Sequence, residues 1–234
     1  MLDRLDAGVQ QLSQFSDDLA HEMRAPLTNL MGKAQVTLSR QRPPEEYKAV
    51  LESNTEELER LARIVSDMLF LAQVSHPAAR GSFTQVSLAE EAHRVMDLFA
   101  LSAEDKQLTL TLSGDAQVQG DRLMIQRALS NLLSNAIRHS PAQSHISMLV
   151  EAYGNQVALS VSNPGPGIEA QHLPHLFERF YRVDSSRART EGGTGLGLAI
   201  VQSIMALHQG QADVRSLPGG FTLFRLVFPR VLPE

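Results

Sequence analysis

Hydrophobic residues recur every three or four positions over roughly the first forty residues. This spacing predicts one long helix, from Met1 to about Arg40, that packs against other helices. The repeat runs through Leu5, Val9, Leu12, Leu19, Met23 and Leu30, with Ser16 and Pro26 in register. His21 lies two positions beyond Leu19, so its side chain is expected to point away from this seam and toward water. Pro26 removes one main-chain hydrogen bond and clashes with the carbonyl of Glu22, which predicts a bend one turn after the histidine.

A second helix is predicted after a turn at Gln41-Arg42-Pro43-Pro44, because paired prolines cannot continue a helix interior. Glu45 and Glu46 open this helix with carboxylates at its positive end. Its seam runs through Leu51, Leu58, Leu61, Val65, Met68 and Ala72, with Asn54 as a polar position. A hairpin with so long a seam cannot bury it alone. Two copies are therefore predicted to pair into a four-helix bundle, and packing on the downstream domain is the alternative.

Beyond the hairpin, the pattern changes to strands interleaved with helices. Val74 to Gly81 has the small residues, proline and glycine of a linker, which divides the chain into residues 1–74, a linker at 75–81 and residues 82–234. Ser87 to Glu90 is typical of a capping box opening a helix to about Ala103, and Asp121 is expected to cap a helix through Ala136. The other expected elements are strands at 83–86, 108–112 and around Val118, a hairpin of 145–153 and 157–162, an irregular stretch at 163–194, a helix at 195–208 and strands at 212–215 and 221–228. This order predicts an α+β sandwich of two layers.

Composition narrows the possible partners. The chain has 234 residues, 43% of them hydrophobic, which suits one large or two ordinary domains with a real core. Its net charge of -5 argues against nucleic acid as a partner. The absence of cysteine excludes disulfides and thiolate metal sites. No apolar run reaches the length of a membrane span and no signal peptide is visible, so the chain is expected to lie on one side of any membrane.

The first candidate for chemistry is the pair His21-Glu22. Imidazole is nucleophilic at neutral pH, and an adjacent carboxylate can accept the proton that the ring loses as it attacks. On the helix alone, an ordinary exposed histidine is the alternative.

The second half of the chain holds four further motifs. Asn131 and Asn135 lie one turn apart on one helix face, where two amides can hold a metal–phosphate unit and the following Arg138 can reach phosphate oxygens. The run 163–168, Asn-Pro-Gly-Pro-Gly-Ile, allows backbone to approach a flat ligand closely. Taken singly, these two motifs are also compatible with surface polar residues and a simple turn.

The other two motifs bring positive charge and free backbone amides. Residues 175–182 combine aromatic side chains with arginines, and Arg187 and Arg189 extend the basic stretch, so this segment could close over phosphates. Residues 192–199 run from a glycine loop into a helix, whose first N–H groups favour phosphate. No strand precedes these glycines and no Gly-Lys-Ser/Thr follows them, which excludes a dinucleotide fingerprint and a P-loop.

These motifs, in this order behind an exposed histidine, resemble the sensor histidine kinases of two-component signalling over nearly the whole chain. The resemblance implies a helical-hairpin dimerisation and histidine-phosphotransfer domain, followed by an ATP-binding domain of the type shared with gyrase and Hsp90. It implies that a homodimer phosphorylates itself with ATP and Mg²⁺ and passes the group to an aspartate in a response regulator receiver domain. The chain would be the cytoplasmic portion of a bacterial inner-membrane protein, attached through a missing N-terminal sensor region.

The resemblance also assigns roles to residues. His21 would be the phosphoacceptor, Glu22 its general base and Asn135 the Mg²⁺ ligand. The remaining ATP-binding positions would be Asn131, Arg138, His139, Asn163, Gly165, Gly167, Phe177, Phe180, Arg182, Gly193, Thr194, Gly195, Leu196, Gly197 and Thr222.

Two positions depart from the common pattern of that family. Asn163 stands where relatives usually carry the Asp that accepts a hydrogen bond from the adenine amino group, and an amide oxygen can still accept it. Ala25 stands where many relatives carry a Thr or Asn that orients a hydrolytic water, which implies weak phosphatase activity. Asn163-Pro164-Gly165 together with residues 180–184 looks most like the heavy-metal sensor kinases, which respond to copper, silver, zinc or cadmium.

Two alternatives belong to other classes. An ATPase of the same nucleotide fold needs a carboxylate on the asparagine helix to activate water, and no Glu lies between Ile125 and Arg138. A dimeric scaffold that binds nucleotide without turnover would not need the intact His21-Glu22 pair.

Overall fold

The computed structural model describes residues 2–74, 83–183 and 193–230; in the first helix it describes side chains from Leu19 onward, apart from that of His21. The chain divides into two compact units between Phe70 and Leu71. The expected linker at 75–81, the basic residues Arg187 and Arg189, and the expected outward direction of the His21 side chain lie outside the described residues. The domain limits therefore stay a prediction.

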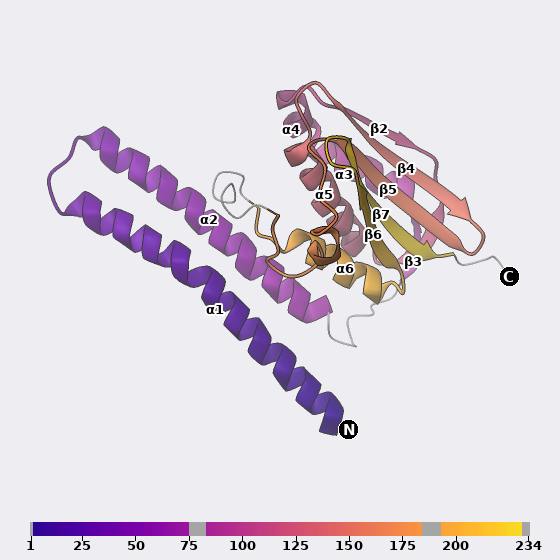
Figure 1. Cartoon of the computed structure of the whole chain (residues 1–234), viewed down its shortest axis with the longest axis horizontal. Helices are drawn as coiled ribbons and strands as arrows, with labels where there is room; N and C mark the ends of the chain where they lie inside the picture. Colours follow the sequence, from indigo (N-terminus) through magenta and orange to yellow (C-terminus); the bar gives the residue numbers. More distant parts are fainter. Residues whose placement is uncertain (1, 75–82, 184–192, 231–234) are drawn as a thin grey trace. The chain divides into compact units, whose positions relative to one another are not determined.

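The first unit is a helical hairpin. Helix α1 (Leu2–Leu38) and helix α2 (Pro44–Val74) run side by side in opposite directions (Figure 1). Lys33 Nζ on α1 donates a hydrogen bond to Ser53 Oγ on α2 at 2.8 Å. Helix α1 continues without interruption through Pro26, and the bend expected there stays a prediction.

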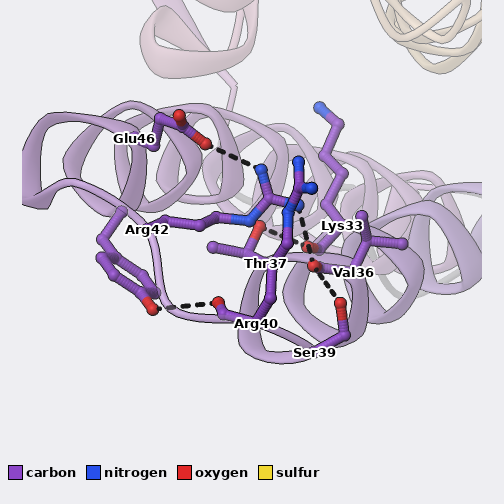
Figure 2. A network of polar contacts seen from close by, with 8 residues as sticks. Lys33, Val36, Thr37, Ser39, Arg40, Arg42 and Glu46 are labelled. Atoms are coloured by element: carbon purple, nitrogen blue, oxygen red, sulfur yellow. Dashed lines mark hydrogen bonds and ion pairs between the residues drawn. The ribbon is translucent and has the colours of Figure 1, made fainter.

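The turn of the hairpin is held by Arg42, whose side chain lies between the two helix ends (Figure 2). Its Nη1 contacts Glu46 Oε2 at 2.7 Å, and its Nη2 donates to the carbonyl oxygen of Val36 at 3.1 Å. Pro44 takes the first position of α2, where its missing N–H costs nothing, and Glu45 and Glu46 stand in the first turn as predicted. The guanidinium thus joins the negative end of α1 to a carboxylate at the positive end of α2.

The apolar seam of α2 is only partly buried within one chain. Leu61 and Met68 are 5% and 1% exposed, as the seam predicts, and Ile64 is fully buried although the seam did not include it. Leu51 and Leu58 were also placed in the seam, yet they are 65% and 55% exposed. Ala72, at the opposite end of the predicted seam, is exposed as well, so one chain leaves parts of the seam at both ends of α2 uncovered.

The second unit is a two-layer α+β sandwich, as predicted. Its main sheet has the order β2-β4-β5-β7-β6, in which β2 runs parallel to β4 and all other neighbours are antiparallel. The strands are β2 (Thr109–Ser113), β4 (His145–Tyr153), β5 (Gln156–Pro164), β6 (Gln211–Ser216) and β7 (Phe221–Pro229). The strands β1 (Thr84–Ser87) and β3 (Gln117–Gly120) form a small antiparallel sheet.

Helices cover one face of the main sheet (Figure 1). They are α3 (Leu88–Leu98), α4 (Ala100–Asp105), α5 (Arg122–His139) and α6 (Gly197–Leu207), with a short 3-10 helix at Leu173–His175. Helix α5 packs against α3, α6 and β5 and lies at the centre of the layer. Asp121 caps it as predicted, with Oδ1 accepting from Met124 N at 3.0 Å. Its buried residues include Leu129, Leu132 and Leu133, each contributing about 2 kcal/mol of burial.

The helix expected from Ser87 to about Ala103 divides at Phe99, so that expectation is wrong in its second half. The cap itself is present, because Ser87 Oγ accepts from Glu90 N at 3.1 Å. Phe99 leaves the helical conformation (φ -101°, ψ 5°), and its N–H closes α3 on the carbonyls of Val95 and Met96. The separate α4 then packs against β2 with Ala103 only 3% exposed.

His208 follows α6 and joins three elements in the core. Its ring is 2% exposed and stacks on Phe83 at 4.6 Å between centroids. Nδ1 lies 2.7 Å from the carbonyl oxygen of Ile204, and Nε2 accepts a hydrogen bond from Asp121 N at 3.0 Å. A neutral ring with its proton on Nδ1 satisfies both bonds. Burial lowers the pKa of His208, and the Ile204 bond and the Asp121 charge offset this only in part.

We expect this ring to make stability depend on pH. In the unfolded chain the imidazole takes up a proton below its ordinary pKa of 6.5, whereas the folded chain holds it neutral to lower pH. The contribution is therefore present above pH 6.5 and lost as pH falls through the lowered pKa. Urea unfolding from about pH 8 to about pH 5 should give a falling free energy of unfolding, and a His208→Phe variant should show a shallower fall from a lower starting value. An equal slope in both proteins would assign the effect to other groups.

Candidate active site

Two amides on α5 form the centre of the candidate site. Asn131 and Asn135 are half-buried and lie one turn apart, as predicted. Asn131 Nδ2 donates to the carbonyl oxygen of Arg127 at 3.0 Å, which fixes the orientation of its amide. A Cβ added at Gly197 would lie 2.9 Å from Asn131 Oδ1, so the first residue of α6 rests directly against this side chain. A larger residue at position 197 would force the Asn131 amide to move.

The glycine loop before α6 is joined to the aromatic segment by its backbone. Phe180 N donates to the carbonyl oxygen of Gly195 at 2.9 Å. Gly195 has φ +75°, and a Cβ there would lie 2.8 Å from Phe180 Cα. Both the dihedral angle and the contact require glycine at this position. Phe180 also has a positive φ, 62°, a conformation that side chains other than glycine rarely adopt.

Positive charge gathers at the start of the same loop. Arg182 Nη1 donates to the carbonyl oxygen of Gly193 at 2.6 Å. A Cβ at Gly193 would lie 2.5 Å from Arg138 Nη1, so the guanidinium from α5 reaches the loop as well. Leu196 N bonds Thr194 Oγ1 at 3.3 Å, and Leu196 supplies no side-chain cap to α6. Two guanidinium groups beside an uncapped helix N-terminus are an arrangement that can hold an anion such as phosphate.

At the other end of the site, Asn163 and Thr222 face each other on adjacent strands. They are directly paired residues of β5 and β7 and are 5% and 7% exposed. A Cβ at Gly165 would lie 2.8 Å from the carbonyl oxygen of His139, so the end of α5 contacts the loop that follows β5. Gly167 has φ +71°, and a Cβ there would lie 2.1 Å from the carbonyl oxygen of Leu217. Helix α5 thus contacts both the glycine loop before α6 and the glycine loop that follows β5.

The aromatic segment rests on the sheet. The ring of Phe177 meets Phe224 edge-on, with centroids 6.4 Å apart. His172 Nδ1 lies 2.7 Å from Tyr181 Oη, and His175 Nδ1 lies 2.7 Å from Glu178 Oε1. Within the described ranges, no three side chains of His, Cys, Asp or Glu gather in a way that could hold a metal ion.

The structure brings Arg138, Phe180 and Arg182 to the loop at 193–197 and pairs Asn163 with Thr222. Phe177 contacts Phe224 instead, and Asn135 lies on α5 one turn from Asn131. Sequence reasoning missed two side chains that support them. Lys106 Nζ donates to the carbonyl oxygens of Ile137 and Arg138, each at 2.9 Å, and so caps the end of α5 that carries the site. Ser216 Oγ accepts a hydrogen bond from the N–H of Ile168, in the glycine loop that follows β5, and shares a second hydrogen bond with the hydroxyl group of Thr222. Neither residue belongs to a local motif, and only the folded chain brings them to their partners.

Family models match both parts of the chain. Residues 11–77 match "His Kinase A (phospho-acceptor) domain", and residues 120–232 match "Histidine kinase-, DNA gyrase B-, and HSP90-like ATPase". The two models follow each other in the order that the motifs predict.

Individual relatives agree with the family models. The chain is 46% identical to the sensor protein IrlS of Burkholderia pseudomallei, over 98% of this chain and 49% of that protein. It is 45% identical to the sensor histidine kinase CusS of Escherichia coli K12, over 98% of this chain and 48% of that protein. It is 42% identical to the sensor protein CzcS of Cupriavidus metallidurans, over 98% of this chain and 48% of that protein.

Solved structures share the fold. The histidine kinase AdeS of Acinetobacter baumannii superimposes with a TM-score of 0.72 at 24% identity, over 91% of this chain and 98% of that one. The histidine kinase ThkA, in a complex with the response regulator protein TrrA, gives a TM-score of 0.75 at 24% identity, over 98% of this chain and 66% of that one.

The chain therefore belongs to the sensor histidine kinases, with a phosphoacceptor hairpin followed by an ATPase-type domain. It spans about half the length of the curated relatives that it matches. Among the helices that the structure describes, none is long and apolar enough to cross a bilayer.

Proposed function

We propose that this chain transfers the γ-phosphoryl group of ATP to His21 and then to an aspartate in the receiver domain of a response regulator. The observation that carries the proposal is the meeting of Arg138, Arg182 and the N-terminus of α6 at residues 193–197. That anion site lies in a chain whose hairpin matches a phosphoacceptor domain around His21. One nucleotide-binding unit and one acceptor histidine are the parts that such a transfer requires.

ATP would lie along α5. The adenine would lie at Asn163 and Thr222, with Gly165, Gly167 and His139 beside it, and the phosphates would lie at Arg138, Gly193, Thr194, Gly195, Leu196 and Gly197. Phe177, Phe180 and Arg182 would close the site from the aromatic segment. The buried polar pair at one end and the cationic loop at the other match a ligand that has a base and phosphates.

The α5 amides fit Mg²⁺ as part of a metal–nucleotide unit. Asn135 offers a neutral amide oxygen one turn from Asn131, and Mg²⁺ is usually held by one or two protein oxygens together with phosphates and waters. When bound, the ion neutralises charge on the phosphates. The chain's own contribution is to hold the triphosphate with Asn131, Arg138 and the α6 N–H groups.

In the transfer step, a ring nitrogen of His21 attacks the γ-phosphorus. A nitrogen–phosphorus bond forms as the bond from the γ-phosphorus to the bridging oxygen breaks, ADP leaves, and Glu22 takes the ring proton. The second step passes the phosphoryl group from the ring nitrogen to a carboxylate oxygen of the regulator.

The proposal extends to a homodimer in a membrane-attached sensor. Leu51, Leu58 and Met31 are 65%, 55% and 61% exposed on one hairpin, and a second copy would cover them in a four-helix bundle. The sensor region would precede this chain and cross the inner membrane, leaving the two described units in the cytoplasm. The likeness to CusS and CzcS supports a sensor of the heavy-metal type.

The test of the proposal is phosphorylation of the purified chain with γ-labelled ATP and Mg²⁺. We expect a label that is stable to base and labile to acid, as a phosphoramidate is. Nucleotide binding without such a label would favour the scaffold alternative, and release of inorganic phosphate without a labelled protein would favour the ATPase.

We expect the chain to be a weak phosphatase, and an Ala25→Thr variant to gain that activity. Ala25 lies on an exposed part of α1, one turn after His21, and its methyl group can neither donate nor accept a hydrogen bond to a water. A threonine hydroxyl there should raise the rate about tenfold or more, because an oriented water reacts faster. The measurement is phosphate release from the phosphorylated regulator with ADP present. Ala62→Thr, at an exposed position of α2, is the matched control, and equal rates for the parent and the Ala25→Thr variant would contradict the expectation.

A further inference from the structure

The turn between β6 and β7 holds the glycine loop that follows β5. Gly165 N donates to the carbonyl oxygen of Gly220 at 3.2 Å, and Gly219 N donates to that of Pro166 at 2.6 Å. Ile168 N donates to Ser216 Oγ at 2.9 Å. The first two bonds join backbone atoms, and only the third uses a side chain. A substitution at Ser216 would therefore remove one of the three hydrogen bonds that hold this loop.

Ser216 belongs to a row of polar side chains across three strands. Asn163 on β5 is paired with Thr222 on β7, and Thr222 is paired with Ser216 on β6. Directly paired residues of antiparallel strands place their side chains on the same face of the sheet. The hydroxyl oxygens of Ser216 and Thr222 are 2.8 Å apart, and Asn163 and Thr222 are buried.

The hydrogen bonds of Ser216 favour one direction for this hydroxyl pair. Ser216 Oγ accepts from Ile168 N and donates to the carbonyl oxygen of Phe221 at 3.1 Å. A hydroxyl has one proton and two lone pairs. With its proton on the Phe221 carbonyl, Ser216 can make the third bond only by accepting the proton of Thr222. The Thr222 oxygen then keeps its lone pairs for a ligand and can act only as an acceptor.

Asn163 presents an acceptor at the same place. Its Nδ2 donates to the carbonyl oxygen of Pro164 at 2.9 Å, which leaves Oδ1 for a ligand. Two neighbouring acceptors match the exocyclic amino group of adenine, whose N–H bonds are donors. Guanine carries a carbonyl oxygen in the equivalent place. This oxygen is itself an acceptor, so it could not bond the acceptor oxygens of Asn163 and Thr222.

We propose that Ser216 is a positioning residue that sets the preference for adenine over guanine, by holding the Thr222 proton away from the bound base. This inference rests on the proposed function, because it needs ATP at Asn163 and Thr222. Ser216 acts through Thr222 and does not itself touch the nucleotide.

The test uses the full chain and measures the affinities of ATP and GTP, with kcat and KM of autophosphorylation for each. In Ser216→Ala, the Thr222 hydroxyl is free to turn and donate to guanine. We expect the ATP-to-GTP affinity ratio to fall about tenfold, in line with one neutral hydrogen bond, with kcat at saturating ATP unchanged. Ser216→Thr keeps the hydroxyl and should keep the ratio. Ser147→Ala, at a half-buried position of β4, is the matched control.

A double-mutant cycle distinguishes two roles of Ser216: orienting the Thr222 hydroxyl, and supporting the loop through its bond to Ile168. Thr222→Val removes the acceptor while leaving Ser216 its bond to Ile168, so it should lower the ratio, and adding Ser216→Ala to it should change the ratio no further. Additive changes in the ratio would overturn the inference, and so would an equal loss of ATP and GTP affinity in Ser216→Ala. An unchanged ratio in a variant that still binds ATP overturns the role of Ser216 alone. A parent chain that does not bind ATP overturns the proposed function.

Discussion

Replacing His21 with glutamine should reduce phosphoryl incorporation from γ-labelled ATP to background. The amide lacks a nucleophilic ring nitrogen but has a similar size and polarity, so the helix around position 21 should persist. We expect the His21→Gln protein to bind ATP with the affinity of the parent, because the nucleotide-site residues all lie in the second half of the chain. The measurement is acid-labile, base-stable label after gel separation, alongside a nucleotide titration.

The matched control for this experiment is His93→Gln. His93 is an exposed histidine of α3, and its replacement tests whether loss of any surface imidazole lowers the label. Full label in His93→Gln together with none in His21→Gln assigns the acceptor. If label persisted in His21→Gln, the phosphoryl acceptor would be another residue, and the proposed mechanism would be wrong.

Asn135→Ala should lower the rate of autophosphorylation by about a hundredfold or more, with His21 intact. Removing the amide removes the proposed protein ligand to the metal–phosphate unit, and charge stabilisation of this kind is worth several kcal/mol in phosphoryl transfer. The loss should appear mainly as weaker binding of ATP in the presence of Mg²⁺. Calorimetric titration with ATP, in the presence and absence of Mg²⁺, measures this loss of affinity directly.

Asn155→Ala is the matched control, because Asn155 lies in the exposed turn between β4 and β5. Thermal unfolding of both variants checks that α5 remains folded. If Asn135→Ala bound ATP and Mg²⁺ as the parent does, the metal would have to be held by other groups and the role given to Asn135 would be lost.

The parts of the fold that sequence could predict are those with local signals. Asp121 before an amphipathic run predicts the start of α5, and the paired prolines predict the hairpin turn. Both predictions succeed because capping and proline sterics act over a few residues. The asparagine pair was likewise visible as two positions on one helix face. The break at Phe99 was not, because the apolar pattern continues through it and the packing of α4 on β2 decides it.

Contacts between distant segments were also beyond the sequence. His208 bonds Asp121, and Lys106 caps the far end of α5, in both cases across long stretches of chain. Nothing in the residues around them marks these partners. The same holds for Ser216 and Thr222, whose pairing depends on strand order. The order β2-β4-β5-β7-β6 is itself a property of the whole unit.

Helix α5 places the core and the candidate site on opposite sides of the same backbone. Leu129, Leu132 and Leu133 face the interior, while Asn131 and Asn135 face the site. Folding and ligand binding are therefore thermodynamically linked through one element. A ligand at about a hundred times its dissociation constant would stabilise this unit by about 2.7 kcal/mol. Substitutions in the hydrophobic face that are marginal in the empty protein can thus be tolerated in a cell rich in nucleotide.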